Sequence, residues 1–498
     1  MVCAFGHLLA KGDSRLQNEL VFADHTVYGA ALISAWKGCA TMPQLAAIIL
    51  AAGQGTRMKS SLAKVLHPLA GKSLVDYPLE LAKTLQAKPI SVIVGAGQAQ
   101  VRHHLKEFHC ITQTKPLGTA HAVLAAKNSL KDFSGYVLIL SGDVPLIKPS
   151  TLKSFISEVF NAQAKLGFIS MELDDPGQYG RVIRDLDGQV NKVAEMKNSS
   201  ADTLKIREVN AGVYCVEKNW LFQALKRVSA DQLTGEYYLP EIIAQAMSQQ
   251  HKVVAHLASD ANEFLGVNTQ ADLALLAKLM RQRINERHML AGVSFVHPEN
   301  TYVDYAVKIG KDTTIYPGSF LQGNTKVGKA CIIENGVVLK DAKLGDGVHV
   351  KAMSVVESSR VAQEAVLGPF ARIRPDSKIG PQVKVGNFVE VKKTEMKAGS
   401  KASHLSYLGD AVIGAGANIG CGTITCNYDG QQKHRTIIGE GAFIGSDTQF
   451  VAPVRVGSGS TIGAGSTITK NVPAKSLAIA RAQQVIVKNW QSKKKHKQ

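Results

Sequence analysis

The sequence has few aromatic residues and no long apolar run, but it is rich in glycine. These features exclude several classes of protein. Phe, Trp and Tyr make up 6% of 498 residues, whereas Gly reaches 44, so we expect a core of aliphatic and small side chains. No window approaches the roughly 18 uninterrupted apolar residues of a transmembrane helix. Hydrophobic residues make up 45%, which excludes a wholly disordered chain. The length corresponds to about three domains.

The cysteines form no paired pattern. Their number, seven, is odd, and no two of them stand in a CxxC motif. This disfavours a disulfide-stapled secreted protein and makes a reducing cytoplasm the expected compartment. The positions are scattered along the chain: Cys3, Cys39, Cys110, Cys215, Cys331, Cys421 and Cys426.

Basic residues outnumber acidic ones. The chain has 58 Lys and Arg against 40 Asp and Glu, which gives a formal net charge of +18. Such an excess fits a solvated basic surface, a nucleic-acid partner or small anionic substrates. The sequence lacks an aromatic ribonucleoprotein motif, a zinc-ligand spacing and a helix-turn-helix pattern, so nucleic acid ranks below anionic metabolites. Residues 488–498 contain five Lys and no acid, which is typical of a disordered tail.

Residues 1–41 do not match a signal peptide. Charged residues interrupt the early apolar run, and the later run Ala30–Ile33 is too short for the apolar part of such a peptide. A second methionine, Met42, directly precedes a segment typical of a strand. We interpret 1–41 as an extension of unknown role and leave open whether translation begins at Met1 or Met42.

Residues 42–270 alternate between two kinds of segment. Short β-branched runs are separated by stretches with helical periodicity, which predicts an α/β domain with a mostly parallel, buried sheet. The expected strands are Leu45–Leu50, Ile90–Val94, Tyr136–Leu140, Gly167–Met171 and Ala211–Val216. A linker at 271–292 follows. Its residues 271–290 predict one amphipathic helix whose apolar face is formed by Leu273, Leu276, Met280 and Ile284.

From 293 to 475 the chain becomes rich in Gly, Val and Ile and repeats with a period of six. A hexapeptide repeat predicts one short strand and one turn per side of a coil, with the aliphatic residue inside, and three sides complete one coil of a parallel β-helix. Residues 476–498 then form a C-terminal segment. The aliphatic positions are Ile309, Ile315, Leu321, Val327, Ile333 and Leu339; Leu367, Ile373, Ile379, Val385 and Val391; and Ile438, Ile444, Phe450, Val456, Ile462 and Ile468.

The period of six breaks twice, at 392–407 and at 427–437. A regular coil needs no interruption, and loops that leave a regular scaffold often carry binding groups. We therefore expect ligand-binding residues in both breaks.

The run AAGQGTRM at 51–58 follows the first expected strand. Small residues there let backbone N–H groups approach a phosphate or a nucleobase. Neither a dinucleotide fingerprint nor a P-loop is present, because Met58 and Leu66 occupy positions where those motifs require Gly. A loop that carries Arg57, with Lys64 nearby, suits a triphosphate. An ordinary strand-to-helix turn remains the alternative.

Ser141-Gly142-Asp143 follows the expected strand at 136–140. A carboxylate just past the carboxyl end of a central parallel strand lies at the crevice where open α/β sheets bind ligands. Mg²⁺ prefers one or two protein oxygens together with phosphate and water, so Asp143 suits a magnesium ion. On its own, the motif also fits a plain turn.

These motifs together resemble sugar-nucleotide pyrophosphorylases, through LAAGQGTRM (50–58), LGTAH (117–121), SGDVP (141–145), YGR (179–181), VNAG (209–212), GEYY (235–238) and GVN (266–268). The hexapeptide region adds GPFARIRP (368–375), GNFVEVKK (386–393), SHLSYLGD (403–410), NYDG (427–430), GSDTQFVAPV (445–454) and IGAGS (462–466). With these, residues 42–490 resemble the family of bifunctional N-acetylglucosamine-1-phosphate uridylyltransferases and glucosamine-1-phosphate acetyltransferases.

The resemblance implies an α/β, Rossmann-like nucleotidyltransferase domain at 42–270 and a left-handed parallel β-helix with acetyltransferase activity at 293–475. It implies a cytoplasmic homotrimer that uses Mg²⁺, UTP and acetyl-CoA, with acetyltransferase sites shared between subunits. The product, UDP-N-acetylglucosamine, would supply peptidoglycan and lipopolysaccharide synthesis.

In the N-terminal half, the resemblance implies transfer of UMP from UTP to N-acetylglucosamine 1-phosphate, with release of pyrophosphate. Arg57 and Lys64 would act on the phosphates, and Asp143 and Asn268 would hold Mg²⁺. The remaining implied substrate contacts are Leu50, Ala51, Ala52 and Gly53 with Gln113, Gly118 and Thr119 for the base, Ser141 and Gly142 beside Asp143, and Gly180, Glu195 and Asn210 for the sugar.

In the C-terminal half, the resemblance implies acetylation of glucosamine 1-phosphate by acetyl-CoA. His404, in the first break, would take the proton that the attacking amine loses, since a histidine titrates near neutral pH. Arg374 and Lys392 would bind the sugar phosphate, and Tyr407 and Asn418 would shape the sugar pocket and orient His404. The implied acetyl-CoA contacts are Cys421, Asn427, Tyr428, Ser446, Ala464 and Arg481. A backbone N–H near Cys421 would face the developing oxyanion.

The sequence departs from the family pattern at a few positions. Ala63 stands where the family usually has Pro, Cys421 where it often has Ala, and Lys115-Pro116 replaces a more polar pair. These changes bear on the loop around Lys64, on thiol reactivity and on the details of the uracil pocket. The extension 1–41 has no counterpart.

Two other functions are alternatives to the bifunctional enzyme. A single-function sugar-1-phosphate nucleotidyltransferase with a regulatory β-helix would have no use for Arg374, Lys392, His404 and Tyr407 together. A trimeric scaffold or basic nucleic-acid-binding protein would retain RNA in a salt-dependent way, and it gives no role to the loop at 50–58 or to Asp143.

Overall fold

The computed structural model describes residues 43–196, 199–488 and 490, and the chain divides into two compact units. The first unit comprises the described residues up to Gly53, Leu79–Ser141 and Ile147–Ala261. The second comprises Gln54–Pro78, Gly142–Leu146 and the described residues from Asn262 onward. The proposed extension 1–41 and most of the Lys-rich tail lie outside the described residues. Within the described part, no helix has the length and apolarity needed to cross a bilayer.

The first unit is built on a mostly parallel sheet. The strands run in the order β11-β7-β10-β6-β1-β4-β5, and β10 is antiparallel to both of its neighbours. The other pairs along this path are parallel, which confirms the predicted α/β architecture. The bounds are β1 (Leu45–Leu50), β4 (Ile90–Gly95), β5 (His109–Gln113), β6 (Tyr136–Ser141), β7 (Leu166–Glu172), β10 (Glu208–Glu217) and β11 (Val253–Leu257).

The five predicted strands form within a residue or a few of their expected bounds. Six further strands among the described residues up to 270 were not predicted: β5, β11, β8 (Arg181–Arg184), β9 (Val190–Ala194), β2 (Pro68–Leu69) and β3 (Lys72–Ser73). These strands are short and partly exposed, so they lack the continuous apolar run that marks a strand buried on both faces.

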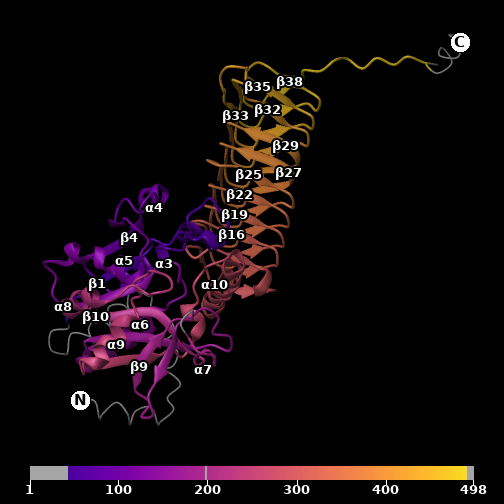
Figure 1. Ribbon diagram of the computed structural model, residues 1–498. Coiled ribbons are helices and arrows are strands. Elements are labelled where there is room, and N and C mark those ends of the chain that lie inside the picture. Colours follow the sequence, from indigo (N-terminus) through magenta and orange to yellow (C-terminus); the bar gives the residue numbers. More distant parts are fainter. Residues whose placement is uncertain (1–42, 197–198, 489, 491–498) are drawn as a thin grey trace, which may run out of the picture. The chain divides into compact units, whose positions relative to one another are not determined.

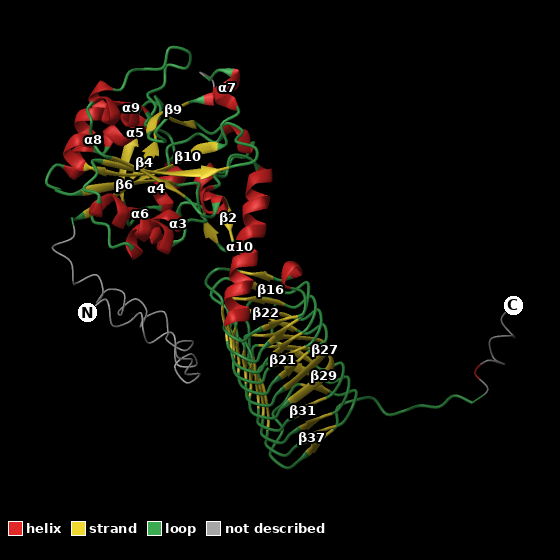
Figure 2. Cartoon of the chain, turned by 90° about the horizontal axis from the view of Figure 1, so that it is seen from below, coloured by secondary structure: helices red, strands yellow, loops and turns green. Residues whose placement is uncertain are grey.

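Helices cover both faces of this sheet (Figure 2). One face packs against α5 (Thr119–Ala125), α8 (Lys218–Ala224) and α9 (Glu241–Ser248), whose apolar residues share a core with Ile48 and Ile139. The other face is covered by α6 (Pro149–Asn161), against which Gly167 of β7 packs closely. Shorter helices are α4 (Ala99–His104) and α7 (Ala201–Leu204), and α3 spans Asp76–Thr84.

The predicted linker helix is α10 (Gln270–Leu290). It begins at a capping box in which Thr269 accepts a hydrogen bond from the backbone N–H of Asp272 at 3.2 Å. Leu276, Met280 and Ile284 of the predicted apolar face are buried, whereas Leu273 is only partly buried against the same core. The predicted helix and its apolar face are confirmed.

The second unit contains the β-helix, whose short strands repeat coil after coil along its length (Figure 1). Strands of successive coils pair in parallel and in register, for example Ile315 with Ile333 and Leu321 with Leu339. One hydrogen-bonded sheet runs around two sides and a nine-stranded sheet forms the third.

The bounds on the first side are β12 (Ser294–Phe295), β15 (Thr314–Ile315), β18 (Ile332–Ile333), β21 (His349–Val350), β24 (Val366–Leu367), β31 (Asn418–Ile419), β34 (Phe443–Ile444), β37 (Thr461–Ile462) and β39 (Leu477–Ala478). On the second side they are β13 (Tyr302–Val303), β16 (Phe320–Gln322), β19 (Val338–Lys340), β22 (Val355–Glu357), β25 (Arg372–Ile373), β32 (Ile424–Cys426), β35 (Gln449–Val451) and β38 (Thr467–Ile468). On the third side they are β14 (Lys308–Ile309), β17 (Lys326–Val327), β20 (Lys343–Leu344), β23 (Arg360–Val361), β26 (Lys378–Ile379), β28 (Glu395–Met396), β30 (Ala411–Ile413), β33 (Thr436–Ile438) and β36 (Val454–Val456).

The aliphatic positions of the repeat point into the β-helix. All of the predicted interior residues are buried except Ile309, which is partly buried in the first strand of its side. Stacked coils therefore enclose a continuous column of Ile, Leu and Val side chains, and burial of this column supplies the main favourable free energy of the fold.

The first break in the period, at 392–407, is not a loop that leaves the scaffold, and that expectation was wrong. The chain there forms two nine-residue strands, β27 (Lys384–Lys392) and β29 (Lys401–Gly409), which pair along their whole length. Val391 pairs with Leu408, 17 positions further along, whereas Ile315 pairs with Ile333 after 18; the 17-residue spacing also occurs in earlier coils, such as Ile333 to Val350. A coil shortened by one residue shifts the phase of the repeat without interrupting the stack.

The second break, at 427–437, does contain an insertion. Ile413 pairs with Ile438, 25 positions further along, whereas Ile438 pairs with Val456 after 18. The added residues form a loop closed by an isolated bridge between Tyr428 and Lys433.

The buried column predicts a large cost for truncation at its centre. Leu339→Ala removes a fully buried side chain, and we expect a loss of about 2–5 kcal/mol in the free energy of unfolding, measured by urea denaturation followed by circular dichroism. The exposed neighbour is the control, since Lys340→Ala should change stability by no more than about 0.5 kcal/mol. Equal effects of the two substitutions would contradict the interior position of Leu339.

Candidate active sites

A cationic cluster forms in the second unit around Lys64. Its ammonium group pairs with the carboxylate of Asp143 and lies 3.4 Å from Oδ1 of Asn268. The guanidinium of Arg57 donates to the same Asn268 oxygen at 3.0 Å. Backbone bonding supports the arrangement, because the N–H of Val267 donates to the carbonyl of Asp143 at 3.0 Å. The structure thus brings together three separate parts of the sequence, which contain Arg57 and Lys64, Asp143, and Asn268.

The loop that carries Arg57 depends on a glycine. Gly55 has φ +64°, and a Cβ atom there would lie 2.6 Å from Cβ of Lys64, so a side chain would displace the lysine. Lys64 begins a short 3₁₀ turn, Lys64–Leu66, directly after Ala63. Ala63 has φ −57°, close to the value that proline imposes, so the backbone is the one expected for the family's proline at this position.

The side-chain oxygens of Asp143 and Asn268 fit a magnesium ion. They converge on one cationic group, the Lys64 ammonium, so they lie close enough to share a cation. A carboxylate and an amide carbonyl are hard oxygen donors, and Mg²⁺ typically takes one or two of these from the protein.

The small-residue run at the end of β1 lies in the first unit and is held by the neighbouring strand. The N–H of Ala51 donates to the carbonyl of Ile93 at 2.9 Å. Gln98 donates to the carbonyl of Gly53 at 3.1 Å while its own oxygen accepts from Gly95. The sequence analysis did not find Gln98, because a polar residue just after a strand carries no distinctive pattern. Leu50 and Ala52 are partly buried.

Gln113, Gly118 and Thr119 are brought together by β5 and the start of α5. Gln113 is buried and donates to the carbonyl of Gly118 at 3.1 Å. Gly118 has φ +98°, and a Cβ atom there would collide with the backbone of Tyr237. The hydroxyl of Thr119 accepts from the N–H of Leu239 at 2.9 Å. These side chains therefore hold the turn before α5 in place, and the expected contacts to a base remain a prediction.

Gly180, Glu195 and Asn210 also lie together in the first unit. The N–H of Asn210 donates to the carbonyl of Gly180 at 2.9 Å, and a Cβ atom at Gly180 would lie 3.4 Å from the Glu195 carboxylate. The Asn210 amide donates to the buried hydroxyl of Tyr214 at 2.6 Å. Burial raises the pKa of Glu195, and the nearby carboxylates of Glu236 and Asp231 raise it further.

Ser141, Gly142 and Asp143 follow one another at the end of a strand, and Gly142 and Asp143 form a turn. Ser141 is the last residue of β6, whereas Gly142 and Asp143 belong to the second unit.

His404 is exposed on β29 and pairs in register with Asn387 of β27. Its Nδ1 lies 3.1 Å from Oδ1 of Asn387. With that oxygen as acceptor, the proton lies on Nδ1 and Nε2 is the free base. Asn387 is thus a further residue that can orient His404, and the expected roles of Tyr407 and Asn418 remain a prediction. Tyr407 lies further along the same strand, and Asn418 pairs with Lys401.

The expected acetyl-CoA residues form a row with His404 along one corner of the β-helix. Register places Cys421 one coil after His404, then Ser446 and Ala464 after one more coil each. Arg481 completes the row by donating to the carbonyl of Ala464 at 2.6 Å. All five residues are exposed. The carbonyl of Cys421 accepts from the N–H of Asp447 at 2.6 Å, so its thiol is presented on an ordered turn.

A second cluster, with Arg374 and Lys392, lies at the next corner. Arg374 donates to the Glu390 carboxylate at 2.7 Å, and this carboxylate raises the pKa of the guanidinium. The pKa of Lys392 is lowered, chiefly by the ammonium of Lys433 beside it and further by Arg374. Crowding of positive charge favours a bound anion. The sequence analysis missed Lys433, although it lies in the second break.

Asn427 and Tyr428 begin the inserted loop. The amide of Asn427, which is buried, donates to the carboxylate of Asp410 one coil earlier. Tyr428 is exposed and its hydroxyl donates to the carbonyl of Gly430 at 2.6 Å. The Asp429 carboxylate accepts backbone N–H bonds from Gln431 and Gln432 and contacts His434 at 2.6 Å, which lowers its pKa and rigidifies the loop.

Comparison with known proteins identifies the family. A nucleotidyl transferase model matches residues 46–271, and a bacterial transferase hexapeptide model matches 306–341 and 435–470. A bifunctional protein GlmU of Pelobacter propionicus is 46% identical over 92% of this chain and the whole of that protein. The chain belongs to the bifunctional GlmU family. GlmU proteins of Geobacter sulfurreducens (47% identical, 91% of this chain, all of that protein) and Listeria welshimeri (45%, 88% and 96%) match similarly.

Membership of the GlmU family confirms the predicted combination of a nucleotidyltransferase and a hexapeptide-repeat transferase in one chain. The two hexapeptide matches end and begin on either side of residues 342–434. This interval contains several coils of 17 residues, such as Val350 to Leu367 and Val391 to Leu408, and most of the inserted loop, so the repeat departs there from a period of 18.

The raised pKa of Glu195 predicts that this residue lowers the stability of the folded state in a pH-dependent way. A carboxylate whose pKa is raised on folding destabilises the folded state when it ionises, so the cost is absent below the unfolded pKa and complete above the folded one. Glu195→Gln should therefore raise the melting temperature more at pH 8 than at pH 4, measured by differential scanning fluorimetry. Glu172→Gln, at an exposed position, is the control. A gain from Glu195→Gln that is the same at both pH values would contradict this assignment.

Proposed function

We propose that this chain catalyses two consecutive steps of UDP-N-acetylglucosamine synthesis in the cytoplasm. Residues 293–475 would acetylate glucosamine 1-phosphate with acetyl-CoA, and residues 42–270 would transfer UMP from UTP to the acetylated product and release pyrophosphate. The observation that carries the proposal is the presence, in one chain, of three groups: the Lys64–Asp143–Asn268 cluster, His404 with its Nδ1 bonded to Asn387, and the Arg374–Lys392–Lys433 cluster at the next corner of the β-helix.

The uridylyl transfer needs charge neutralisation rather than a general base, because the sugar phosphate is already an anionic nucleophile. Arg57 and Lys64 bring positive charge to a flexible triphosphate and orient it for attack. Backbone N–H groups of the run at 50–53 and the pocket of Gln113, Gly118 and Thr119 would hold the base. Gly180, Glu195 and Asn210 would hold the sugar.

Asp143 and Asn268 are the residues that would hold Mg²⁺. When bound, the ion neutralises phosphate charge and stabilises the leaving pyrophosphate. Lys64 contacts both oxygens in the structure, so the same residue links the metal ligands to the phosphate-binding cations.

The acetyl transfer needs a base, because the attacking ammonium must lose a proton. Nε2 of His404 is available for this role while Asn387 holds Nδ1. Arg374, Lys392 and Lys433 would bind the sugar phosphate, with Tyr407 and Asn418 beside the sugar. The row Cys421, Ser446, Ala464 and Arg481 would hold the extended acetyl-CoA, together with Asn427 and Tyr428 of the inserted loop.

The spacing of these groups favours a site completed by a second subunit. Asn387, the neighbour of His404, and Lys392 stand five positions apart on β27, which corresponds to up to about 16 Å of extended chain. The amine and phosphate of one aminosugar phosphate are closer together than that. We therefore infer a homotrimer in which His404 of one chain works with the phosphate-binding cluster of another.

Two single substitutions should separate the two activities. His404→Ala should reduce release of free thiol from acetyl-CoA about 10²–10⁴-fold, because the base is lost. It should leave pyrophosphate release from UTP and N-acetylglucosamine 1-phosphate unchanged. Asp143→Asn should show the reverse pattern, with a loss of about 10²–10³-fold in pyrophosphate release. His349→Ala, which alters another β-helix histidine, is the control. Loss of both activities in either active-site variant would refute the assignment of two independent sites.

Mixed oligomers test the shared site. We expect His404→Ala and Lys392→Ala each to lack thiol release alone. Subunits of the two variants that are dissociated and reassembled together should regain activity, because some sites then combine an intact His404 with an intact Lys392. A mixture that stays inactive while its oligomeric state is restored would place both residues in one chain's site.

A further inference from the structure

A row of basic residues runs along the third side of the β-helix. Register places Lys308, Lys326, Lys343, Arg360 and Lys378 on successive coils, each paired with the next. All five side chains are exposed. Neighbouring strands lie about 4.8 Å apart, so the row is about 19 Å long. The next position in register is Glu395, which ends the run of positive charge.

These cations make no ion pair within the described residues, although the acidic Glu395 stands beside Lys378 at the end of the row. None of the five takes part in an ion pair there. Two acids at nearby corners are engaged elsewhere, since Asp341 accepts from the N–H of Asn324 and Asp346 from the N–H of Lys329. Like charges that face each other across adjacent strands destabilise a sheet. A bound anion would relieve this repulsion.

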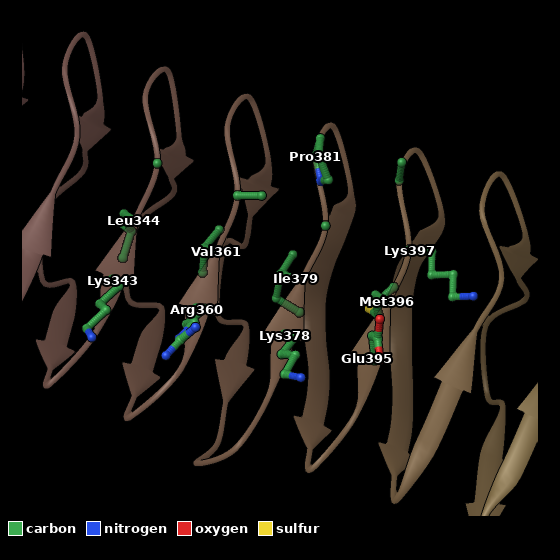
Figure 3. A pocket seen from close by; sticks show the side chains of 14 residues that line it. Lys343, Leu344, Arg360, Val361, Lys378, Ile379, Pro381, Glu395, Met396 and Lys397 are labelled. Carbon is green, nitrogen blue, oxygen red and sulfur yellow. The ribbon is translucent and has the colours of Figure 1, made fainter.

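A shallow groove of about 530 Å³ lies beside the row, and Figure 3 shows Lys343, Arg360, Lys378 and Glu395 following one another along it. Small residues, Gly345, Ala362 and Gly380, line the groove next to the cations. A Cβ atom at Gly345 or Gly380 would lie 2.8 Å from the backbone of the next coil, so the close stacking of coils excludes larger side chains there. The packing of the β-helix therefore leaves an open channel along a line of positive charge.

We propose that this groove binds a linear phosphate chain that lies along the axis of the β-helix. The site is separate from the residues assigned to either reaction, and the inference does not rest on the proposed function. Regular spacing of single positive charges matches a ligand with regularly repeated negative charges. It also accounts for part of the net charge of +18 that the two candidate active sites do not use.

The lining of the groove favours inorganic polyphosphate over other polyanions. None of the residues that line it is aromatic, so it offers no platform for stacking the bases of a single-stranded nucleic acid. Apart from Lys397, which also lines the groove, the cations form one line rather than a broad patch, and this suits a single chain better than the plane of an anionic membrane. Arg360 adds bidentate contacts to phosphate oxygens within the row.

Binding of long-chain inorganic polyphosphate to the full-length chain tests the proposal. We would measure it by isothermal titration calorimetry with UTP and acetyl-CoA present, so that other anion-binding residues are occupied. Long-chain polyphosphate should bind more tightly than tripolyphosphate, because only the long chain spans the row. The variant Lys343→Gln/Arg360→Gln/Lys378→Gln should bind it at least tenfold more weakly, with a log–log salt slope smaller by roughly two to three.

The control removes the same charge elsewhere. Lys106→Gln/Lys470→Gln/Lys475→Gln alters exposed lysines that lie off the row and should bind polyphosphate as the unaltered chain does. Equal losses in both triple variants would show that only net charge matters and would overturn the proposal. Tighter binding of oligo(dT) or of anionic phospholipid vesicles than of polyphosphate would overturn it as well.

Discussion

The whole β-helix depends on one constraint, the in-register parallel stacking of its coils. Each coil must place its aliphatic residues over those of the coil before, as Ile315, Ile333 and Val350 do, while the backbones hydrogen-bond in parallel. Once the interior column is aligned, every outward position is aligned as well. Residues 17, 18 or 25 positions apart then become neighbours, so side chains that share no local motif form rows on the surface.

The two candidate active sites use charge in different ways. Around Lys64, the carboxylate of Asp143 offsets part of the charge of Lys64 and Arg57, and the neutral amide oxygen of Asn268 accepts from both cations, which suits the proposed reaction on phosphates. Near Lys392, positive groups crowd one another and lower the pKa of that lysine. Such a site favours a bound anion, whereas His404 lies at a separate corner and is bonded to a neutral amide.

Residue patterns predicted the strands and helices well where the interior is apolar and regular. Short β-branched runs marked β1, β4, β6, β7 and β10, and the spacing of apolar residues marked α10. Polar, partly exposed strands such as β5 were missed, because burial on one side only leaves no continuous apolar signal. The interruption at 392–407 was misjudged for a related reason. A shift of phase by one residue looks the same in a sequence as an inserted loop, and only pairing between β27 and β29 distinguishes them.

The sequence by itself determined the fold class, the family and the residue types at both candidate sites, because periodicity and motifs are local properties of a chain. Only the tertiary structure decided which residues support them. Gln98, Asn387 and Lys433 act through contacts with residues 17 to 45 positions away. A local sequence pattern does not predict such contacts. The same holds for the basic row from Lys308 to Lys378. Its members are unremarkable lysines and an arginine in the sequence, and they become one line of charge only because the coils stack in register.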